Sequence, residues 1–301
     1  MFIINHKKIF LAISLLLMIS SGVVLAVWGL PLGIDFTGGS LLEVRFSEQR
    51  LEAPLVREAL QKFDLGNVSV QPLEEKAVLI RMKDVNEETH REILKSLGEK
   101  AENQSMEEIR FESVGPIIGQ ELKEKAVWAI AFVLLMIVVY ITYAFRGASR
   151  PVSSWRYGLA AIIALFHDVL ITTGVFSVLA LTMGKEADLL FVTALLTILG
   201  FSVHDTIVVF DRIRENLRKG SAGTFAESVG FSLSQTFTRS VLTSFSTLLA
   251  LFAVFFWGGA SIKDFSLVLI VGMFLGTYSS LFIASPLLVL WQERAAKSRN
   301  A

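Results

Sequence analysis

Residues 200–216 read GFSVHDTIVVFDRIREN and place ionisable side chains inside an apolar region. Fifteen uncharged residues, 189–203, lead directly into His204 and Asp205. An ionisable pair within a hydrophobic helix is costly unless it faces a partner or a water-filled cavity. The stretch therefore predicts a membrane-spanning helix that carries a functional site. The alternative is a polar residue that reaches the membrane surface from the helix end, for which the Asp side chain is short.

Composition agrees with a membrane protein. Of 301 residues, 53% are hydrophobic and the formal net charge is zero, while the mean hydropathy is +0.58. A neutral chain has no general attraction to nucleic acid, so we expect no nucleic-acid partner. Because the chain has no cysteine, disulfides, thiolate catalysis and thiolate metal sites are excluded.

Six hydrophobic segments are long enough to cross a hydrocarbon core of about 30 Å. They are 9–30, 126–145, 157–183, 189–210, 239–257 and 265–290. A cleaved signal peptide is the rival interpretation of the first, but its apolar run is longer than a typical signal core.

These segments predict the division of the chain. We expect a cytoplasmic N-terminus and first span over 1–31, a soluble domain over 32–125, and a five-helix bundle over 126–292. The bundle would include a cytoplasmic loop over 211–235, and 293–301 would be a cytoplasmic tail.

Basic residues gather on one side of the membrane if the chain crosses it six times. The four groups are His6 to Lys8; Arg146, Arg150 and Arg156; Arg212, Arg214, Arg218 and Lys219; and Arg294, Lys297 and Arg299. Cytoplasmic loops carry the excess of Lys and Arg. We therefore expect both termini in the cytoplasm and residues 32–125 outside it.

The soluble domain has the β-α-β-β-α-β pattern of a ferredoxin-like α+β sandwich. Alternating and helical periodicities place strands at 40–46, 67–71, 77–82 and 108–114 and helices at 53–63 and 86–102. Residues 33–40, GIDFTGGS, lack the spacing of a nucleotide-binding loop. We interpret them as a sharp turn into an edge strand.

Four motifs together resemble the SecF family of bacterial protein-export subunits. They are GIDFTGGSLLEVRF, VGPIIGQEL, FHDVLITTG and FSVHDTIVVFDRIREN, and the resemblance covers essentially the whole chain. It implies a six-helix half-transporter of the resistance-nodulation-division (RND) type in the bacterial cytoplasmic membrane. It also makes Asp35, Gly38, Gly39, Gly115, Gly119, Asp211 and Arg212 structural residues of the family motifs.

The resemblance implies an export function without enzymatic activity or a cofactor. SecF-type subunits pair with SecD and assist the SecYEG translocon with the proton-motive force, so protons would be the coupling ion. The further partners implied are YajC, YidC, the translocating preprotein and membrane lipid. One residue departs from the family pattern, because His204 stands where Asn is more usual.

Physical reasoning and the resemblance both select Asp205 and Arg239 for proton flow. Asp205 would lie about six residues, or roughly 9 Å, from the cytoplasmic end of its helix. Arg239, at the start of the fifth span, could then meet it across helices. An anchoring role at the membrane surface is the alternative for Arg239.

Two other residues complete the predicted proton pathway. His204 could share the proton because imidazole titrates near neutral pH. Asp168 lies near the middle of the third span, as a relay or as a structural carboxyl bonded to Thr172. We interpret His167 as a packing or hydrogen-bonding histidine and Asp211 as an anchor at the helix end.

Other functions remain as alternatives at this stage. An RND-type half-unit that exports small molecules or lipids is the main alternative, and a purely scaffolding subunit is another. Enzymatic interpretations are weak, because the chain lacks HExxH, GxSxG and GxGD motifs. A metal held by the two His-Asp doublets is also disfavoured, since adjacent residues lie about 100° apart on a helix.

Overall fold

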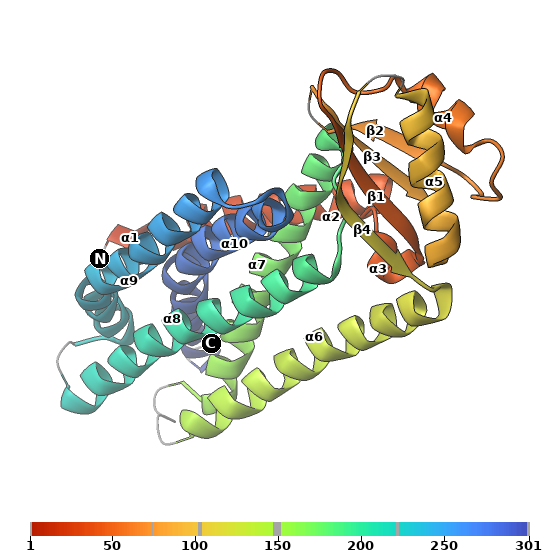
Figure 1. Ribbon diagram of the computed structural model, residues 1–301. Helices are drawn as coiled ribbons and strands as arrows, with labels where there is room; N and C mark the ends of the chain where they lie inside the picture. Colours follow the sequence, from red (N-terminus) through yellow and green to blue (C-terminus); the bar gives the residue numbers. More distant parts are fainter. Residues whose placement is uncertain (1, 74, 102–103, 147–151, 221–222, 300–301) are drawn as a thin grey trace. The chain divides into compact units, whose positions relative to one another are not determined.

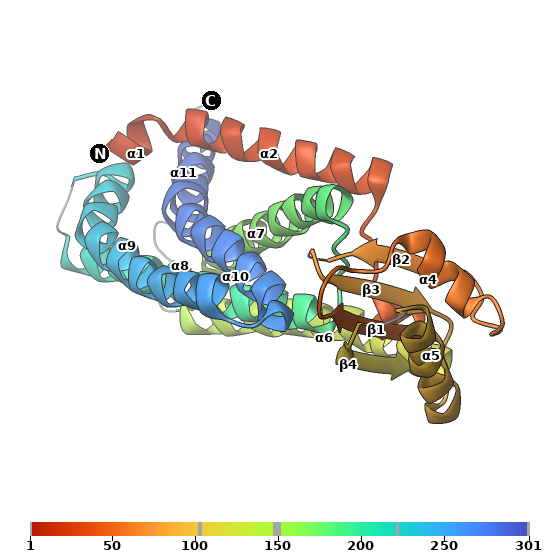
Figure 2. The same ribbon diagram turned by 45° about the horizontal axis from the view of Figure 1, so that its top comes forward.

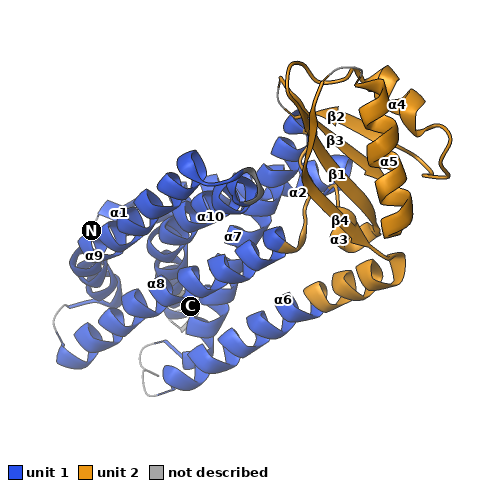
Figure 3. Ribbon diagram, viewed as in Figure 1, with its two compact units in different colours: residues 1–30, 128–183, 190–301 blue, residues 31–127, 184–189 orange. Residues whose placement is uncertain are grey.

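The computed structural model describes residues 2–73, 75–101, 104–146, 152–220 and 223–299. Arg150, one of the basic residues used for orientation, lies outside them. The chain forms two compact units (Figure 3). Unit 1 comprises residues 1–30, 128–183 and 190–301, and unit 2 comprises residues 31–127 and 184–189.

Unit 2 is built on one antiparallel sheet. Its elements are β1 (Gly39–Phe46), α4 (Ala53–Leu60), β2 (Ser69–Pro72), β3 (Ala77–Met82), α5 (Glu87–Lys100) and β4 (Met106–Val114). The strand order is β2-β3-β1-β4 and every pair is antiparallel. This is the split βαβ arrangement, so the predicted ferredoxin-like topology is confirmed.

The domain core follows from strand alternation. Leu42, Val44 and Phe46 point to one face of β1 and are at most 1% exposed, because side chains alternate along a strand. Helices α4 and α5 cover that face (Figure 1), where Ile93 and Leu97 are fully buried. The hydrophobic pattern that predicted the domain is therefore its core.

The prediction of an edge strand after the glycine turn is wrong. β1 lies between β3 and β4, and one helical turn, α3 (Ile34–Thr37), precedes it. Gly38 (φ +73°) and Gly39 (φ +126°) adopt backbone conformations that favour glycine. A Cβ at Gly38 would come within 2.7 Å of Pro116 Cα, and one at Gly39 within 2.8 Å of Met82 O. The two glycines are thus required by conformation and by close packing.

Segment 184–189 is a part of unit 2 that the sequence did not predict. Gly33 N–H donates to Ala187 O, and Ala187 N–H donates to Pro31 O, both at 2.8 Å. Glu186 forms an ion pair with Arg81 of β3, with Nε and Oε2 3.0 Å apart. Burial raises the pKa of Glu186, and Arg81 offsets part of that rise.

The helices expected to cross the membrane belong to unit 1, except that the first turns of α6 belong to unit 2. Within the described residues, six helical segments are long and apolar enough to cross a membrane. They are α2 (Lys7–Trp28), α6 (Pro116–Ala144), α7 (Ser154–Met183), α8 (Leu189–Lys219), α9 (Phe225–Trp257), and a sixth formed by α10 (Ala260–Ser279), the π-helical η1 (Ser280–Ala284) and α11 (Ser285–Arg299). A short helix, α1 (Phe2–Asn5), precedes them.

Several helices extend beyond the predicted membrane spans. In the predicted loop 211–235, α8 continues to Lys219 and α9 begins at Phe225, so residues 211–219 and 225–235 are helical. Glu215 pairs with Lys219 at 2.6 Å along α8, and Thr224 and Glu227 form a capping box at the start of α9. α6 also begins ten residues before the predicted span at 126, and the predicted tail 293–301 is helical as far as Arg299.

The bundle packs around α7. Small buried residues on this helix, among them Ala160, Ala161 and Ala164, are at most 1% exposed and let neighbouring helices approach. α2 and α10 run beside α7 (Figure 2). By contrast, α2, α6 and α9 expose many large apolar side chains, as expected for helices that face lipid or a partner.

The Arg81–Glu186 ion pair predicts how firmly segment 184–189 is held. We expect Arg81→Met to increase hydrogen exchange at the Ala187 and Leu189 amides at pH 7, because a buried carboxylate then lacks its cation. Without Arg81 the pKa of Glu186 rises further when the segment is docked. In this variant, docking of the segment is unaffected when the pH is below 4.5, the ordinary pKa of a Glu carboxyl. Docking weakens as the pH rises through the pKa that Glu186 has in the docked segment.

The matched control is Lys83→Met, which removes an exposed pair with Asp64 just beyond the same strand. It should leave the exchange unchanged. Equal protection in the wild type and in Arg81→Met at pH 7 would contradict the prediction.

Candidate functional site

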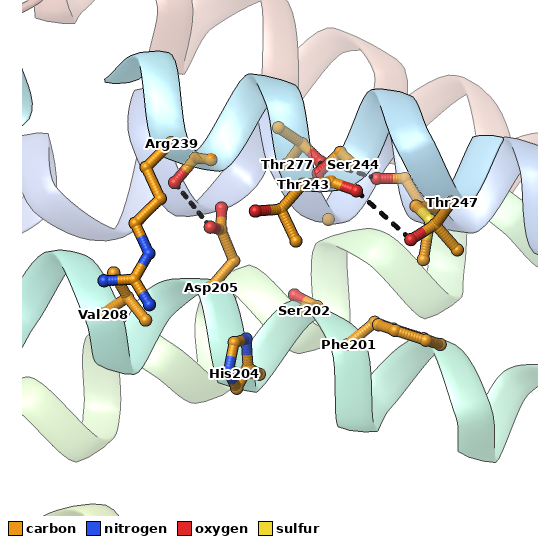
Figure 4. A pocket seen from close by; sticks show the side chains of 13 residues that line it. Phe201, Ser202, His204, Asp205, Val208, Arg239, Thr243, Ser244, Thr247 and Thr277 are labelled. Carbon is orange, nitrogen blue, oxygen red and sulfur yellow. Dashed lines mark hydrogen bonds between the residues drawn. The ribbon is translucent and has the colours of Figure 1, made fainter. Parts of the chain in front are cut away.

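A polar cavity of about 110 Å³ lies among α8, α9 and α10. Its lining residues are Phe201, Ser202, His204, Asp205, Val208, Arg239, Ser240, Thr243, Ser244, Thr247, Met273, Gly276 and Thr277. Figure 4 shows these side chains and labels ten of the residues. Hydroxyls, a carboxylate and a guanidinium line part of this space, which is large enough for water.

Within the described residues, only one of the two carboxyl oxygens of Asp205 has a hydrogen-bond partner. Its Oδ1 accepts a hydrogen bond of 2.6 Å from Ser240 Oγ on α9 (Figure 4). Its Oδ2 is buried and has no hydrogen-bond partner within the described residues, although Ser280 lies nearby. The carboxyl therefore has one oxygen held by the protein and one available to bind a proton.

Arg239 lines the same cavity but does not form an ion pair with Asp205 within 4.0 Å. Its side chain extends from α9 toward α8 beside Val208 (Figure 4). Helix α9 begins at Phe225, so Arg239 lies fourteen residues inside this helix and not at its first turn. The Arg239 side chain is exposed in this chain.

A second cavity of about 570 Å³ shares Val208 and Arg239 with the first. It is also lined by Asp211, Arg212 and Glu215. Arg239 is therefore the charged residue common to both cavities.

His204 lies beside the cavity on a different side of α8 from the Asp205 carboxylate (Figure 4). The 100° step between neighbouring helical residues explains the separation. His204 is exposed in this chain, so the imidazole faces whatever covers α8. His204 and Asp205 therefore point in different directions, as the sequence analysis expected for adjacent residues of a helix.

Asp168 is fully buried and bound by three side chains. Its Oδ1 contacts His167 Nδ1 at 2.9 Å, and its Oδ2 accepts from Ser202 Oγ at 2.6 Å and Ser279 Oγ at 2.7 Å. The predicted bond to Thr172 is wrong, because Thr172 Oγ1 has no partner within the described residues. The interpretation of His167 as a hydrogen-bonding residue is confirmed.

The sequence analysis missed the serines that hold the two carboxyls. Ser202, Ser240 and Ser279 donate to Asp168 or Asp205 from three different elements. Serine is common in membrane helices as a packing residue, so composition alone does not mark these three. Only the position of Ser202 could have been noticed in the sequence. It precedes Asp205 by three residues and so lies on the same side of the helix as Asp205.

The predicted motif residues have structural contacts. Asp35 Oδ2 accepts from Leu189 N–H, the first amide of α8, at 2.8 Å. A Cβ at Gly119 would lie 2.8 Å from Gly38 N, whereas one at Gly115 would meet nothing within 4 Å. The structure therefore explains Gly119 and gives no reason for Gly115.

Asp211 and Arg212 connect neighbouring turns and helices. Asp211 pairs with Arg214 at 2.8 Å, and Arg212 Nε donates to Gln235 of α9 at 2.6 Å. Asp211 was predicted to lie at the helix end. It lies inside the helix instead, because α8 continues to Lys219. Within the part of the chain that the structure describes, no three His, Cys, Asp or Glu side chains are grouped to hold a metal.

Comparison with known sequences identifies the family. The family described as "Protein export membrane protein SecD/SecF, C-terminal" matches residues 93–294, and the "SecD/SecF GG Motif" matches residues 23–49. The chain is 40% identical to the protein translocase subunit SecF of Anaerolinea thermophila, over 97% of this chain and 94% of that protein. This chain belongs to the SecF family. Its fold is that of a multi-pass membrane protein of the Sec system.

Other similarities support the same family. The chain is 42% identical to SecF of Thermobaculum terrenum, over 97% of this chain and 94% of that protein. It also matches the crystal structure of SecDF, a translocon-associated membrane protein from Thermus thermophilus, with a TM-score of 0.82 and 34% identity. That match covers 96% of this chain but 38% of the SecDF chain. A super-membrane-facing form of SecDF matches with a TM-score of 0.70 at 33% identity, over 99% of this chain and 40% of that chain.

The Ser240 hydrogen bond predicts a measurable effect on stability. We expect Ser240→Ala to lower the free energy of unfolding in detergent by about 1–3 kcal/mol, because Asp205 Oδ1 loses its donor while it stays buried. The matched control is Ser246→Ala on the same helix, whose hydroxyl bonds Thr243 O of its own helix. That change should stay within about 0.5 kcal/mol. Equal losses in the two variants would contradict the prediction.

Proposed function

We propose that this protein couples the proton-motive force to protein export as the SecF-type partner of SecD. The observation that carries the proposal is the polar cavity among the spanning helices that is lined by Asp205 and Arg239. Ionisable residues inside a membrane domain are expensive and mark ion or proton pathways. Membership of a family of translocase subunits supplies the process that the protons would drive.

Each charged residue of the cavity has a distinct role in this proposal. Asp205 binds and releases the proton at Oδ2, while Ser240 holds Oδ1. Arg239, which belongs to both cavities, favours release because a nearby cation stabilises the carboxylate. His204, on the exposed side of α8, shares the proton, and Asp168 is a second carboxyl of the pathway.

The available energy is sufficient for a conformational switch. One charge that crosses 100 mV yields about 2.3 kcal/mol, and one pH unit adds about 1.4 kcal/mol. Two conformations of a protein commonly differ by a few kcal/mol. A single proton can therefore reverse such an equilibrium.

An exposed polar surface supports pairing with another membrane subunit. His204 and Thr243 line the cavity but are exposed in this chain, as is Arg239. Lipid tails offer no hydrogen bonds to such groups, so a partner that covers them is needed. The chain accounts for 38% of the matched SecDF chain, and the SecD part of such an assembly is the partner we propose.

The remaining assignments follow the family. SecYEG, YajC, YidC, the translocating preprotein and membrane lipid are proposed as further contacts. The bacterial cytoplasmic membrane is the proposed location. Both termini would be cytoplasmic and residues 32–125 outside, on the basis of the Lys and Arg distribution.

The central prediction concerns Asp205→Asn. We expect this change to abolish the stimulation of export by a proton gradient, because asparagine keeps the size of the side chain but cannot bind or release the proton. Asp205→Glu should retain part of the stimulation. Arg239→Lys should also retain part, since lysine keeps the charge without the planar guanidinium. The measurement is protein export into inverted membrane vesicles with an imposed gradient, with each variant normalised to its membrane level.

Asp211→Asn is the matched control on the same helix. It breaks the pair with Arg214 and should lower the membrane level more than the stimulation per molecule. Full stimulation in Asp205→Asn would remove the proton-coupling proposal and leave a scaffolding role. Normal export in all variants with a loss of lipid or small-molecule export would favour the RND exporter alternative.

A separate prediction concerns the partner surface. The chain has no cysteine, so single cysteines can be placed without background reactions. We expect Thr243→Cys to form disulfides with cysteines placed along SecD spans. Val241→Cys is exposed on the same helix but is turned by about 200°, and it should form none. Cross-links from both positions, or from the control alone, would contradict this surface.

A further inference from the structure

Two consecutive serines lie where the sixth span changes its helical type. Ser279 ends α10 and Ser280 begins the π-helical segment η1. Both are fully buried. π-helical turns are rare and frequently occur at functional sites. Here the change of helical type presents adjacent hydroxyls to two different helices.

The two hydroxyls reach the surroundings of both carboxyls. Ser279 Oγ lies 2.7 Å from Asp168 Oδ2 and 3.1 Å from Gly276 O. Ser280 Oγ lies 2.8 Å from Thr206 Oγ1, and Thr206 directly follows Asp205 on α8. The junction of α10 and η1 therefore contacts Asp168 on α7 and the neighbour of Asp205 on α8.

Protonation of Asp168 would change these bonds. Its Oδ2 now accepts from both Ser202 and Ser279, whereas a protonated oxygen becomes a donor. The two hydroxyls cannot both keep donating to it as they do now. Ser279 has a second acceptor within reach in Gly276 O, so it is the group that can turn away.

We propose that Ser279 is a positioning residue that links proton binding at Asp168 to the position of α8 at Asp205. In the step, a hydronium ion supplied by the gradient loses one proton, which bonds to Asp168 Oδ2 and leaves water, and the Ser279 hydroxyl hydrogen turns to Gly276 O. Because Ser280 is joined to Thr206, a change at the α10–η1 junction reaches the turn of α8 that carries Asp205. The inference rests on the proposed proton coupling at Asp205.

Other titratable side chains surround this network. His167 on α7 bonds Asp168 Oδ1, and the Tyr278 ring of α10 stacks on His167 with centroids 6.1 Å apart. Arg239 lies beyond Asp205 on α9, and the two line the cavity together. None of these contacts the Ser279 hydroxyl within the described residues, so a change at Ser279 tests the proposed link without removing a titratable group.

The test is Ser279→Ala in the vesicle export assay, with Ser266→Ala as the matched control. Ser266 is also fully buried on α10, but its hydroxyl donates to Ile262 O of its own helix. We expect Ser279→Ala to lower gradient-stimulated export about tenfold, the effect of losing one hydrogen bond to a charged group. Ser266→Ala should leave export unchanged both with and without the gradient. Ser279→Thr, which keeps the hydroxyl, should restore most of the stimulation.

A double variant separates coupling from general damage. If Ser279 acts through Asp168, Ser279→Ala combined with Asp168→Asn should be no worse than the more severe single change. Losses that multiply in the double variant would overturn the inference. If Ser279→Ala lowers the membrane level, Ser279→Cys preserves the side-chain shape with a weaker donor. Reduced stimulation in that variant would support the link and wild-type stimulation would overturn it.

The outcomes distinguish this inference from the proposed function. Full stimulation in Asp205→Asn would remove proton coupling at Asp205, and the inference with it. Lost stimulation in Asp205→Asn together with unchanged stimulation in Ser279→Ala would remove the inference alone.

Discussion

The bundle depends on the hydrogen bonds of one buried carboxyl. The interior of a membrane supplies no water to satisfy a polar group, so each such group must find its partner within the protein. Asp168 on α7 meets this constraint with donors from its own helix, from α8 and from α10. These bonds fix the relative depth of three helices, because a shift along any of them would leave a buried oxygen without its donor. Asp168 thus joins three of the membrane helices through hydrogen bonds.

Asp205 shows what happens when the same constraint is only partly met. It lies three residues beyond Ser202 on α8, yet it has one donor and one buried oxygen without a partner. Polar networks that are only partly satisfied are costly, and they persist where function requires them. The two carboxyls therefore differ in their hydrogen bonding: both oxygens of Asp168 have partners, whereas Asp205 has one buried oxygen without a partner within the described residues.

The sequence predicted those features that depend on periodicity and missed those that depend on tertiary contacts. Strand and helix patterns gave the six spans and the ferredoxin-like topology, because alternation and apolar length are local properties. The extensions of α8 to Lys219 and of α9 back to Phe225 were missed. Polar helical turns beyond a membrane look like loops when only hydropathy is read. Asp205 was found because it interrupts an apolar run, whereas Ser240 and Ser279 have no such contrast with their neighbours.

Segment 184–189 ties the first residue of α8 into the α+β domain. The first amide of this helix is bonded to Asp35, and the preceding residues pair with Pro31 and Gly33. Asp35 and Leu189 are 154 positions apart in the sequence. The domain therefore completes its fold only after residue 189 has been made, although most of its residues precede the second span.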